Sequence, residues 1–271
     1  LQGDQWDTVM NYDAFMEPVT WFLTGMEKHS DWKKPELCGD GRAFFDTMRY
    51  AWCDMQYGSI MSAMNELSNH DHSRFLTRTN KTMGRLSTSG SRAAEEGLNF
   101  GLFSAAVTLQ MTWPGSPTIY YGDEAGLCGW TDPDSRRPYP WGHENHHVLD
   151  FHTYMISIHK HDVFRYGSFK ELCVQGPLIA YGRMYGRQAA LIVINAGECS
   201  MDVDIPVWEI GMTDDMTITR VVASNQDKYN VGYHHRGSKN GYLHCRMMPY
   251  SSKVYINWAA DEHNVTWVDR Y

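Results

Sequence analysis

The first half of the chain alternates short apolar runs with longer segments in which apolar residues recur every three or four positions. The short runs predict strands over residues 6–12, 65–68 and 118–121. The longer segments predict helices over residues 14–25, 42–57, 91–109 and 149–161. The third helix is expected to begin at an N-cap serine, Ser91. Strands that alternate with helices in this way predict a parallel sheet over residues 1–165.

The pattern changes at Gly167, where short β-rich runs separated by Gly, Asn, Asp and Pro replace the helices. These runs cover residues 178–185, 189–196, 201–205, 217–223, 241–247 and 253–258. Short strands with turn residues between them predict an antiparallel β-sandwich over residues 167–258. Residues 259–271 are expected to form a polar tail.

Composition narrows the class of protein. Hydrophobic residues make up 42% of the 271 positions, which is enough for a substantial core, and the net charge of −8 argues against a nucleic-acid partner. No apolar run approaches the ~20 residues that cross a bilayer, so no membrane partner is expected. The six cysteines form no CxxC pair, which predicts free thiols and a reducing, cytoplasmic location. The N-terminus lacks Met and signal-peptide character, and we interpret it as a cut edge.

Three motifs follow one another in the first half. Residues 67–71 read Leu-Ser-Asn-His-Asp, residues 115–124 read Gly-Ser-Pro-Thr-Ile-Tyr-Tyr-Gly-Asp-Glu, and residues 132–141 read Asp-Pro-Asp-Ser-Arg-Arg-Pro-Tyr-Pro-Trp. Their order and spacing resemble the last motifs of the α-amylase superfamily, family 13 of the glycoside hydrolases. The Cys-Gly-Trp-Thr stretch before Asp132 is nearest the neopullulanase, cyclomaltodextrinase and maltogenic amylase group. Asn69 departs from several of those enzymes, which carry Ser there.

The resemblance implies an architecture. The three strand–helix units would be the sixth, seventh and eighth of a (β/α)8 TIM barrel, followed by the β-sandwich domain that the family carries. Three units cannot close a barrel that needs eight. The family's nucleophilic Asp and acid/base Glu belong to motifs upstream of these, which this sequence does not contain. We therefore expect the N-terminal half of the barrel on a missing or separate chain, and no glycosidase turnover from this chain alone.

The same resemblance assigns roles at the first motif. Asp71 matches the carboxylate that stabilises the oxocarbenium-like transition state. A retaining enzyme also uses two further carboxyl groups, the nucleophile and the acid/base. His70 matches the imidazole that hydrogen-bonds the sugar at the point of cleavage. The alternative for this tripeptide is an Asx turn beside a surface histidine.

Asp132 and Arg136 match the carboxylate and guanidinium of the family's Asp-Pro-x-x-Arg stretch. Together they can bind vicinal hydroxyls of a sugar. The alternative is an ion-paired loop without a ligand. Arg137 is expected to face solvent or a structural partner.

No cofactor or metal is implied. His143, Glu144, His146 and His147 together invite a zinc hypothesis, but the spacing is not HExxH, and a solvated loop is the preferred interpretation. The sequence thus predicts the C-terminal part of a retaining α-glucan hydrolase acting on starch-derived maltooligosaccharides or cyclodextrins. The alternative is a non-catalytic fragment, or a glucan-binding partner of another chain.

Overall fold

The first half of the chain contains a short parallel sheet. The structure is a computed structural model that describes residues 7–258, so the tail predicted over residues 259–271 lies outside the described part. Strand β1 (Met64–Glu66) pairs in parallel with β2 (Ser116–Thr118), and Met10 forms a parallel bridge with Met64. The three segments therefore lie side by side in chain order, as the alternation of strands and helices predicted.

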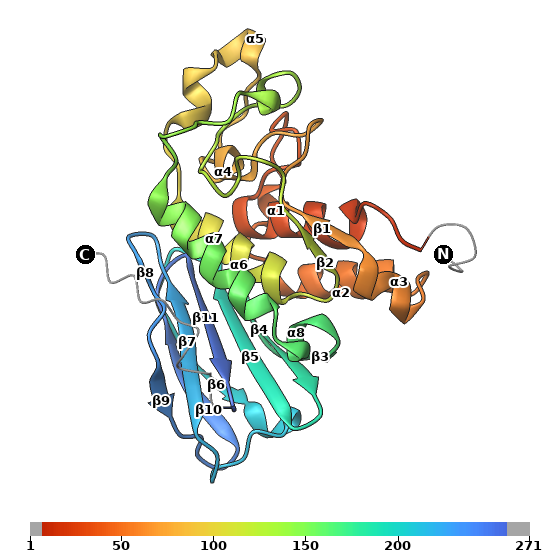
Figure 1. Cartoon of the computed structure of the whole chain (residues 1–271), viewed down its shortest axis with the longest axis vertical. Coiled ribbons are helices and arrows are strands. Elements are labelled where there is room, and N and C mark those ends of the chain that lie inside the picture. Colours follow the sequence, from red (N-terminus) through yellow and green to blue (C-terminus); the bar gives the residue numbers. More distant parts are fainter. Residues whose placement is uncertain (1–6, 259–271) are drawn as a thin grey trace.

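Helices connect these parallel segments (Figure 1). Before β1 lie η1 (Tyr12–Met16), α1 (Glu17–Thr24), η2 (Pro35–Leu37), α2 (Gly41–Trp52) and α3 (Tyr57–Ser62). Between β1 and β2 lie α4 (Phe75–Arg78), α5 (Leu86–Ser89), η3 (Arg92–Glu95) and α6 (Phe100–Thr112). After β2 come η4 (Asp134–Arg136), α7 (His146–His159) and α8 (Asp162–Arg165). Helix α1 ends at Gly25, which adopts the left-handed conformation (φ 68°), as the sequence predicted.

Several predicted boundaries were wrong; for example, the helix expected over residues 42–57 ends at Trp52. Helix α6 is capped by Asn99, whose side chain accepts a hydrogen bond from the Leu102 N–H, and not by Ser91. Gly97, with φ 69°, separates α6 from the 3-10 turn that follows Ser91. The strand expected over residues 118–121 is β2, which pairs earlier, over Ser116–Thr118. The run predicted over residues 6–12 contributes a single bridge at Met10, and its first residue lies outside the described part.

The second half is antiparallel throughout. Its strands are β3 (Ser168–Gln175), β4 (Leu178–Tyr185), β5 (Gln188–Asn195), β6 (Met201–Pro206), β7 (Ile218–Ser224), β8 (Tyr229–Asn230), β9 (His234–Arg236), β10 (Tyr242–Met247) and β11 (Ser251–Ile256), with the 3-10 turn η5 (Val207–Ile210) after β6. The larger sheet has the order β3-β4-β5-β11-β7-β8, with β9 also paired to β7. Strands β6 and β10 form a second sheet, and an apolar cluster that includes Leu178, Val203 and Leu243 contains residues of both sheets. The predicted antiparallel strands are confirmed, whereas β3, β8 and β9 were not predicted.

Helix α6 joins the two halves into one core. Residues 101–112 are all buried, because the helix packs against the helices α1 and α7 and also against the strands β7 and β11 (Figure 1). Gly101 lies so close to the loop before β11 that a Cβ would come within 2.5 Å of the Tyr250 carbonyl oxygen. Beyond the helix, the Trp113 ring contacts Phe169 and Tyr181 at centroid distances of 4.7 and 5.0 Å.

A buried arginine ties the same junction by hydrogen bonds. Arg183 on β4 is fully buried and donates to the carbonyl oxygens of Thr112 (2.7 Å), Phe164 (2.9 Å) and Gly167 (2.8 Å). Burial lowers the pKa of Arg183 to about 10, so the group stays protonated at neutral pH. Its Nε also donates to the Ser168 carbonyl oxygen at 3.3 Å. One side chain thus donates to four carbonyl groups where the helical part meets the sheet.

We predict that Arg183→Met lowers the free energy of unfolding by about 3 kcal/mol, because the carbonyl oxygens that it holds, such as those of Thr112 and Phe164, lose their Arg183 donors in a buried place. Urea titration measures the change. Arg187→Met is the matched control, because Arg187 is exposed in the next turn and should change stability by less than ~0.5 kcal/mol. Equal losses in the two variants would show that the Arg183 contacts contribute nothing specific.

Candidate active site

The loops that follow β1 and β2 meet at one edge of the parallel sheet. Both strands run in the same direction, so their carboxyl ends lie side by side. Residues 67–73 leave β1 there, and residues 119–136 leave β2. All four side chains predicted as site residues lie on these two loops.

Asn69 shapes the first loop. Its Oδ1 accepts hydrogen bonds from the backbone N–H groups of Asp71 and His72, both at 3.0 Å. Its Nδ2 donates to Glu66 Oε1 at 2.9 Å and to the Tyr12 hydroxyl at 3.0 Å. Asn69 is 2% exposed, so these bonds are shielded from water. The Asx turn is therefore real, and it turns the chain so that residues 70 and 71 stand on the surface.

The second loop is bonded to the first through backbone carbonyl groups. The Ser135 hydroxyl donates to the carbonyl oxygen of His70 at 3.0 Å. The Thr131 hydroxyl and the Asp132 N–H both donate to the carbonyl oxygen of Asp71. Because both carbonyl groups are held from the opposite loop, the backbone beneath the site has a defined position.

The four predicted site residues come together. Arg136 Nε lies 2.6 Å from Asp132 Oδ1, and Arg136 Nη2 lies 3.6 Å from Asp71 Oδ1. His70 Nε2 lies 3.4 Å from the same Asp71 oxygen. The hydrogen bond to Asp132 raises the pKa of Arg136 above its ordinary value. The four side chains are 47–55% exposed, so their polar atoms remain open to a ligand.

Arg74, which the sequence analysis missed, supports this arrangement from below. It is fully buried, donates from Nε to the Ser135 carbonyl oxygen at 3.0 Å and pairs through Nη1 with Asp123 Oδ1 at 2.9 Å. Its guanidinium also lies over the Tyr120 ring, 4.2 Å from the centroid. One charge thus ties both loops to the core, and the only sequence signal is an arginine three positions after Asp71.

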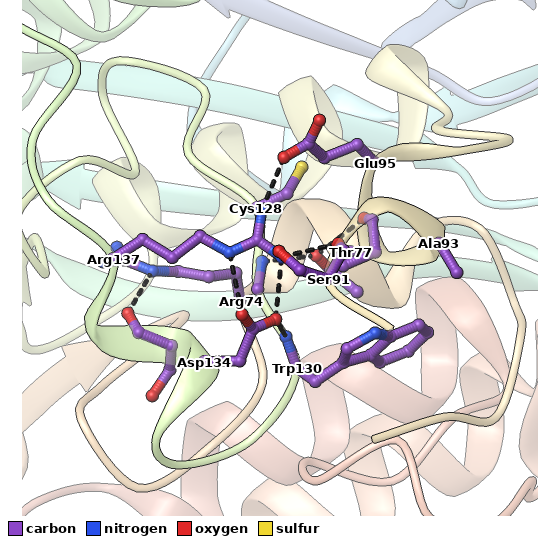
Figure 2. A network of polar contacts seen from close by, with 12 residues as sticks. Arg74, Thr77, Ser91, Ala93, Glu95, Cys128, Trp130, Asp134 and Arg137 are labelled. Carbon is purple, nitrogen blue, oxygen red and sulfur yellow. Dashed lines mark hydrogen bonds and ion pairs between the residues drawn. The ribbon is translucent and has the colours of Figure 1, made fainter. Parts of the chain in front are cut away.

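Arg137 has structural partners. Figure 2 shows its guanidinium between Asp134 and Glu95, with the forked contact to Asp134 at 3.0 and 2.7 Å. Asp134 Oδ2 also accepts the backbone N–H of Trp130 at 2.9 Å. The side chain of Arg137 is 16% exposed, which leaves it committed to holding the loop. This is one of the two roles that the sequence analysis expected for Arg137.

The other candidates have local explanations. Between residues 7 and 258, no group of three or more His, Cys, Asp or Glu side chains is arranged to hold a metal ion. Glu124 accepts the Gly122 N–H at 2.9 Å, which closes the turn after β2. The six cysteines are free thiols. No helix in the described part of the chain is long and apolar enough to cross a bilayer.

His72 is buried against other rings beside the site. It is 4% exposed, packs edge-on against Tyr12 and His29, and leaves Nδ1 without a hydrogen-bond partner. Burial, reinforced by nearby Arg78, lowers the pKa of His72 to about 3. The imidazole is therefore neutral at ordinary pH.

We predict that His72→Phe makes stability less sensitive to acid. The unfolded chain gains a proton at His72 below about pH 6.5, whereas the folded protein gains it only near pH 3, so wild-type stability falls by up to ~1.4 kcal/mol per pH unit in that window. Phe keeps the ring packing and removes the proton. Urea titrations from pH 7 to 4 should show a shallower decline for His72→Phe, and the wild-type decline for the exposed control His143→Phe. A decline as steep as in the wild type would mean that His72 is not buried as a neutral ring.

Comparison with protein families matches residues 2–169 to the family described as alpha amylase, catalytic domain. An amylopullulanase from Thermoanaerobacter thermohydrosulfuricus is 32% identical over 219 residues, which are 73% of this chain and 14% of that protein. A cyclomaltodextrinase from Thermoanaerobacter pseudethanolicus is 32% identical over 199 residues, which are 72% of this chain and 29% of that protein. The chain therefore spans less than a third of either relative.

Solved structures agree on the fold. A debranching enzyme from Nostoc punctiforme matches with a TM-score of 0.70 and 24% identity, over 94% of this chain and 47% of that one. A protein from Thermus thermophilus matches with a TM-score of 0.70 and 21% identity, over 95% of this chain and 50% of that one. The family match covers more than half of the sequence, and the motifs that suggested it lie within the matched residues. The chain belongs to the α-amylase family of glycoside hydrolases.

Proposed function

We propose that this chain forms part of the active site of a retaining α-glucan hydrolase that acts on starch-derived oligosaccharides or cyclodextrins. The α-1,4 glucosidic bond is the proposed target, with α-1,6 bonds as the alternative. The observation that carries the proposal is the convergence of His70 and Arg136 on the Asp71 carboxylate, with Asp132 beside them, at the open ends of two parallel strands. The family membership supports the class of reaction.

Asp71 is the proposed transition-state stabiliser. As the glycosidic bond breaks, the sugar ring flattens and gains positive charge, so a carboxylate that accepts its hydroxyl groups binds the transition state more tightly than the substrate. His70 lies beside Asp71 and can donate a hydrogen bond to the same sugar. The backbone bonds from Asn69 and Thr131 keep both side chains aimed at the surface.

Asp132 and Arg136 form the proposed glycone-binding pair. The carboxylate accepts and the guanidinium donates, so neighbouring hydroxyls of one sugar can bridge the two groups. Arg136 also reaches toward Asp71, which supports a position for this pair one sugar away from the cleaved bond.

The proposed enzyme needs further polypeptide. Double displacement requires a nucleophile and an acid/base carboxyl about 5–5.5 Å apart. Two other carboxylates of the site loops are already engaged: Asp132 with Arg136, and Asp123 with Arg74. Within residues 7–258, the parallel sheet also has open edges at Met10 and β2, which neighbouring barrel strands would cover. We propose that the N-terminal half of a barrel, on the same or a separate chain, supplies both.

The alternative is a non-catalytic glucan-binding or structural fragment. Mass spectrometry of the purified material distinguishes the two by revealing whether a second polypeptide carries the missing strands. Assays on maltooligosaccharides and nitrophenyl maltosides then test the activity. Turnover by the isolated 271-residue chain, above that of its Asp71→Asn variant, would contradict the requirement for further polypeptide.

We predict that Asp71→Asn in the assembled enzyme lowers kcat below about a tenth of wild type while KM changes little, because the lost contact strengthens only as charge develops. Steady-state kinetics on maltooligosaccharides measures both constants. Asp54→Asn is the control, because Asp54 is an exposed carboxylate on another loop. A variant that keeps more than a tenth of kcat would reduce Asp71 to a binding residue.

We predict that Arg136→Ala weakens binding of substrates with two or more glycone sugars by about ten- to hundredfold, the usual range for losing a charge-assisted hydrogen bond. Substrates with one glycone sugar should lose less, because they do not reach the Arg136 pair. Arg92→Ala, at a 92% exposed side chain, should change neither. Equal losses on long and short substrates would remove Arg136 from the binding pair.

A further inference from the structure

A buried carboxyl group that the proposed reaction does not use lies beneath the site. Glu66 is the last residue of β1 and is 3% exposed. Its neighbour Asn65 donates from Nδ2 to the Pro114 carbonyl oxygen at 3.0 Å, on the helix side of the sheet. Successive side chains of a strand point to opposite faces, so Glu66 lies on the face away from α6, under the loop that carries Asp71.

Glu66 connects to that loop through a single side chain. Its Oε1 accepts from Asn69 Nδ2 at 2.9 Å, and Asn69 Oδ1 accepts from the N–H groups of Asp71 and His72. An amide whose NH2 donates to a carboxylate is polarised, which makes its oxygen a better acceptor. The charge on Glu66 therefore strengthens the bonds that orient Asp71.

This position is unfavourable for an acid. Burial raises the pKa of Glu66, with Asp123 acting in the same direction, and the Asn69 hydrogen bond, His70 and Arg78 offset only part of that rise. A raised folded-state pKa means that the ionised group makes folding less favourable as the pH rises above the unfolded pKa. Leucine would suit a buried strand end better, so stability does not account for an acid here.

We propose that Glu66 is a positioning residue that acts through Asn69 to hold the backbone of Asp71 in the orientation needed for transition-state binding. An effect of Glu66 on turnover rests on the proposed function, whereas its effect on the order of the loop at residues 69–73 can be measured independently of that function. The Tyr12 hydroxyl, the second acceptor of Asn69 Nδ2, completes the clamp from the segment beside β1.

The test compares Glu66→Leu with the wild type in the full protein by three measurements. Hydrogen exchange of the peptide covering residues 69–73 should speed up, because the Asp71 and His72 amides lose a well-held acceptor. The midpoint of urea unfolding at pH 7 should stay the same or rise. If the enzyme turns over maltooligosaccharides, kcat should fall about ten- to hundredfold, as expected for a misplaced catalytic group.

Two further variants complete the design. Glu66→Gln keeps an acceptor oxygen without the charge, so its exchange rate and kcat should lie between those of the wild type and Glu66→Leu. It also serves if Glu66→Leu fails to fold. Glu171→Leu is the control, because Glu171 lies on β3, pairs with Arg42 and Arg49 of α2, and should leave exchange at residues 69–73 unchanged.

The outcomes separate the two proposals. Faster exchange confined to residues 69–73, in an assembled enzyme that has no glucan turnover, supports the positioning role and counts against the proposed reaction. Unchanged exchange in both Glu66 variants overturns the positioning role, whatever the activity. A general rise in exchange together with lost stability also overturns it, because Glu66 would then be an ordinary structural residue.

Discussion

Buried guanidinium groups hold this protein together where its backbone leaves regular structure. Parallel strands of three residues offer few ladder hydrogen bonds, so the loops beyond them expose carbonyl groups that need donors inside the protein. Arg74 supplies donors to the loop after β2, and Arg78 donates to the Leu67 and Ser73 carbonyl oxygens beside β1. Arg183 does the same where α6 meets the sheet. The planar fork of arginine suits this task, because one side chain reaches several carbonyl groups at once.

This arrangement explains how an exposed site can be well positioned. The side chains of Asp71, Asp132 and Arg136 are about half exposed, yet the backbone under them is bonded to buried groups on both loops. The polar atoms are thus exposed to solvent on a backbone that is less mobile than that of an ordinary surface loop. For a site that would bind a charge as it develops, this preorganisation matters more than the strength of any surface ion pair.

Local signals were readable in the sequence, and tertiary ones were not. The end of α1 was predictable because the left-handed position that ends the helix favours glycine, and Gly25 is visible in the sequence. The apolar run of β4 likewise predicts a buried strand. Strand β3 was missed because it lies at a sheet edge and mixes polar with apolar residues. The motifs located Asp71 and Arg136. Arg74 and Glu66 were missed because their partners, Asp123 and Asn69, lie three or more residues away in the chain, and no local pattern marks such contacts.

The burial of α6 on all sides has a consequence for how such proteins can be recombined. The change of pattern at Gly167 looks like a natural crossover point between a helical module and a sheet module. A chimera joined there would set the outer face of one parent's α6 against the other parent's β7 and β11. The contacts of Gly101 with the Tyr250 carbonyl oxygen, and of Trp113 with Tyr181, would then have to be matched by unrelated partners. A chimera that exchanges the sheet should therefore take α6 and Trp113 from the same parent. The segment that must be exchanged as one piece is larger than the strands alone.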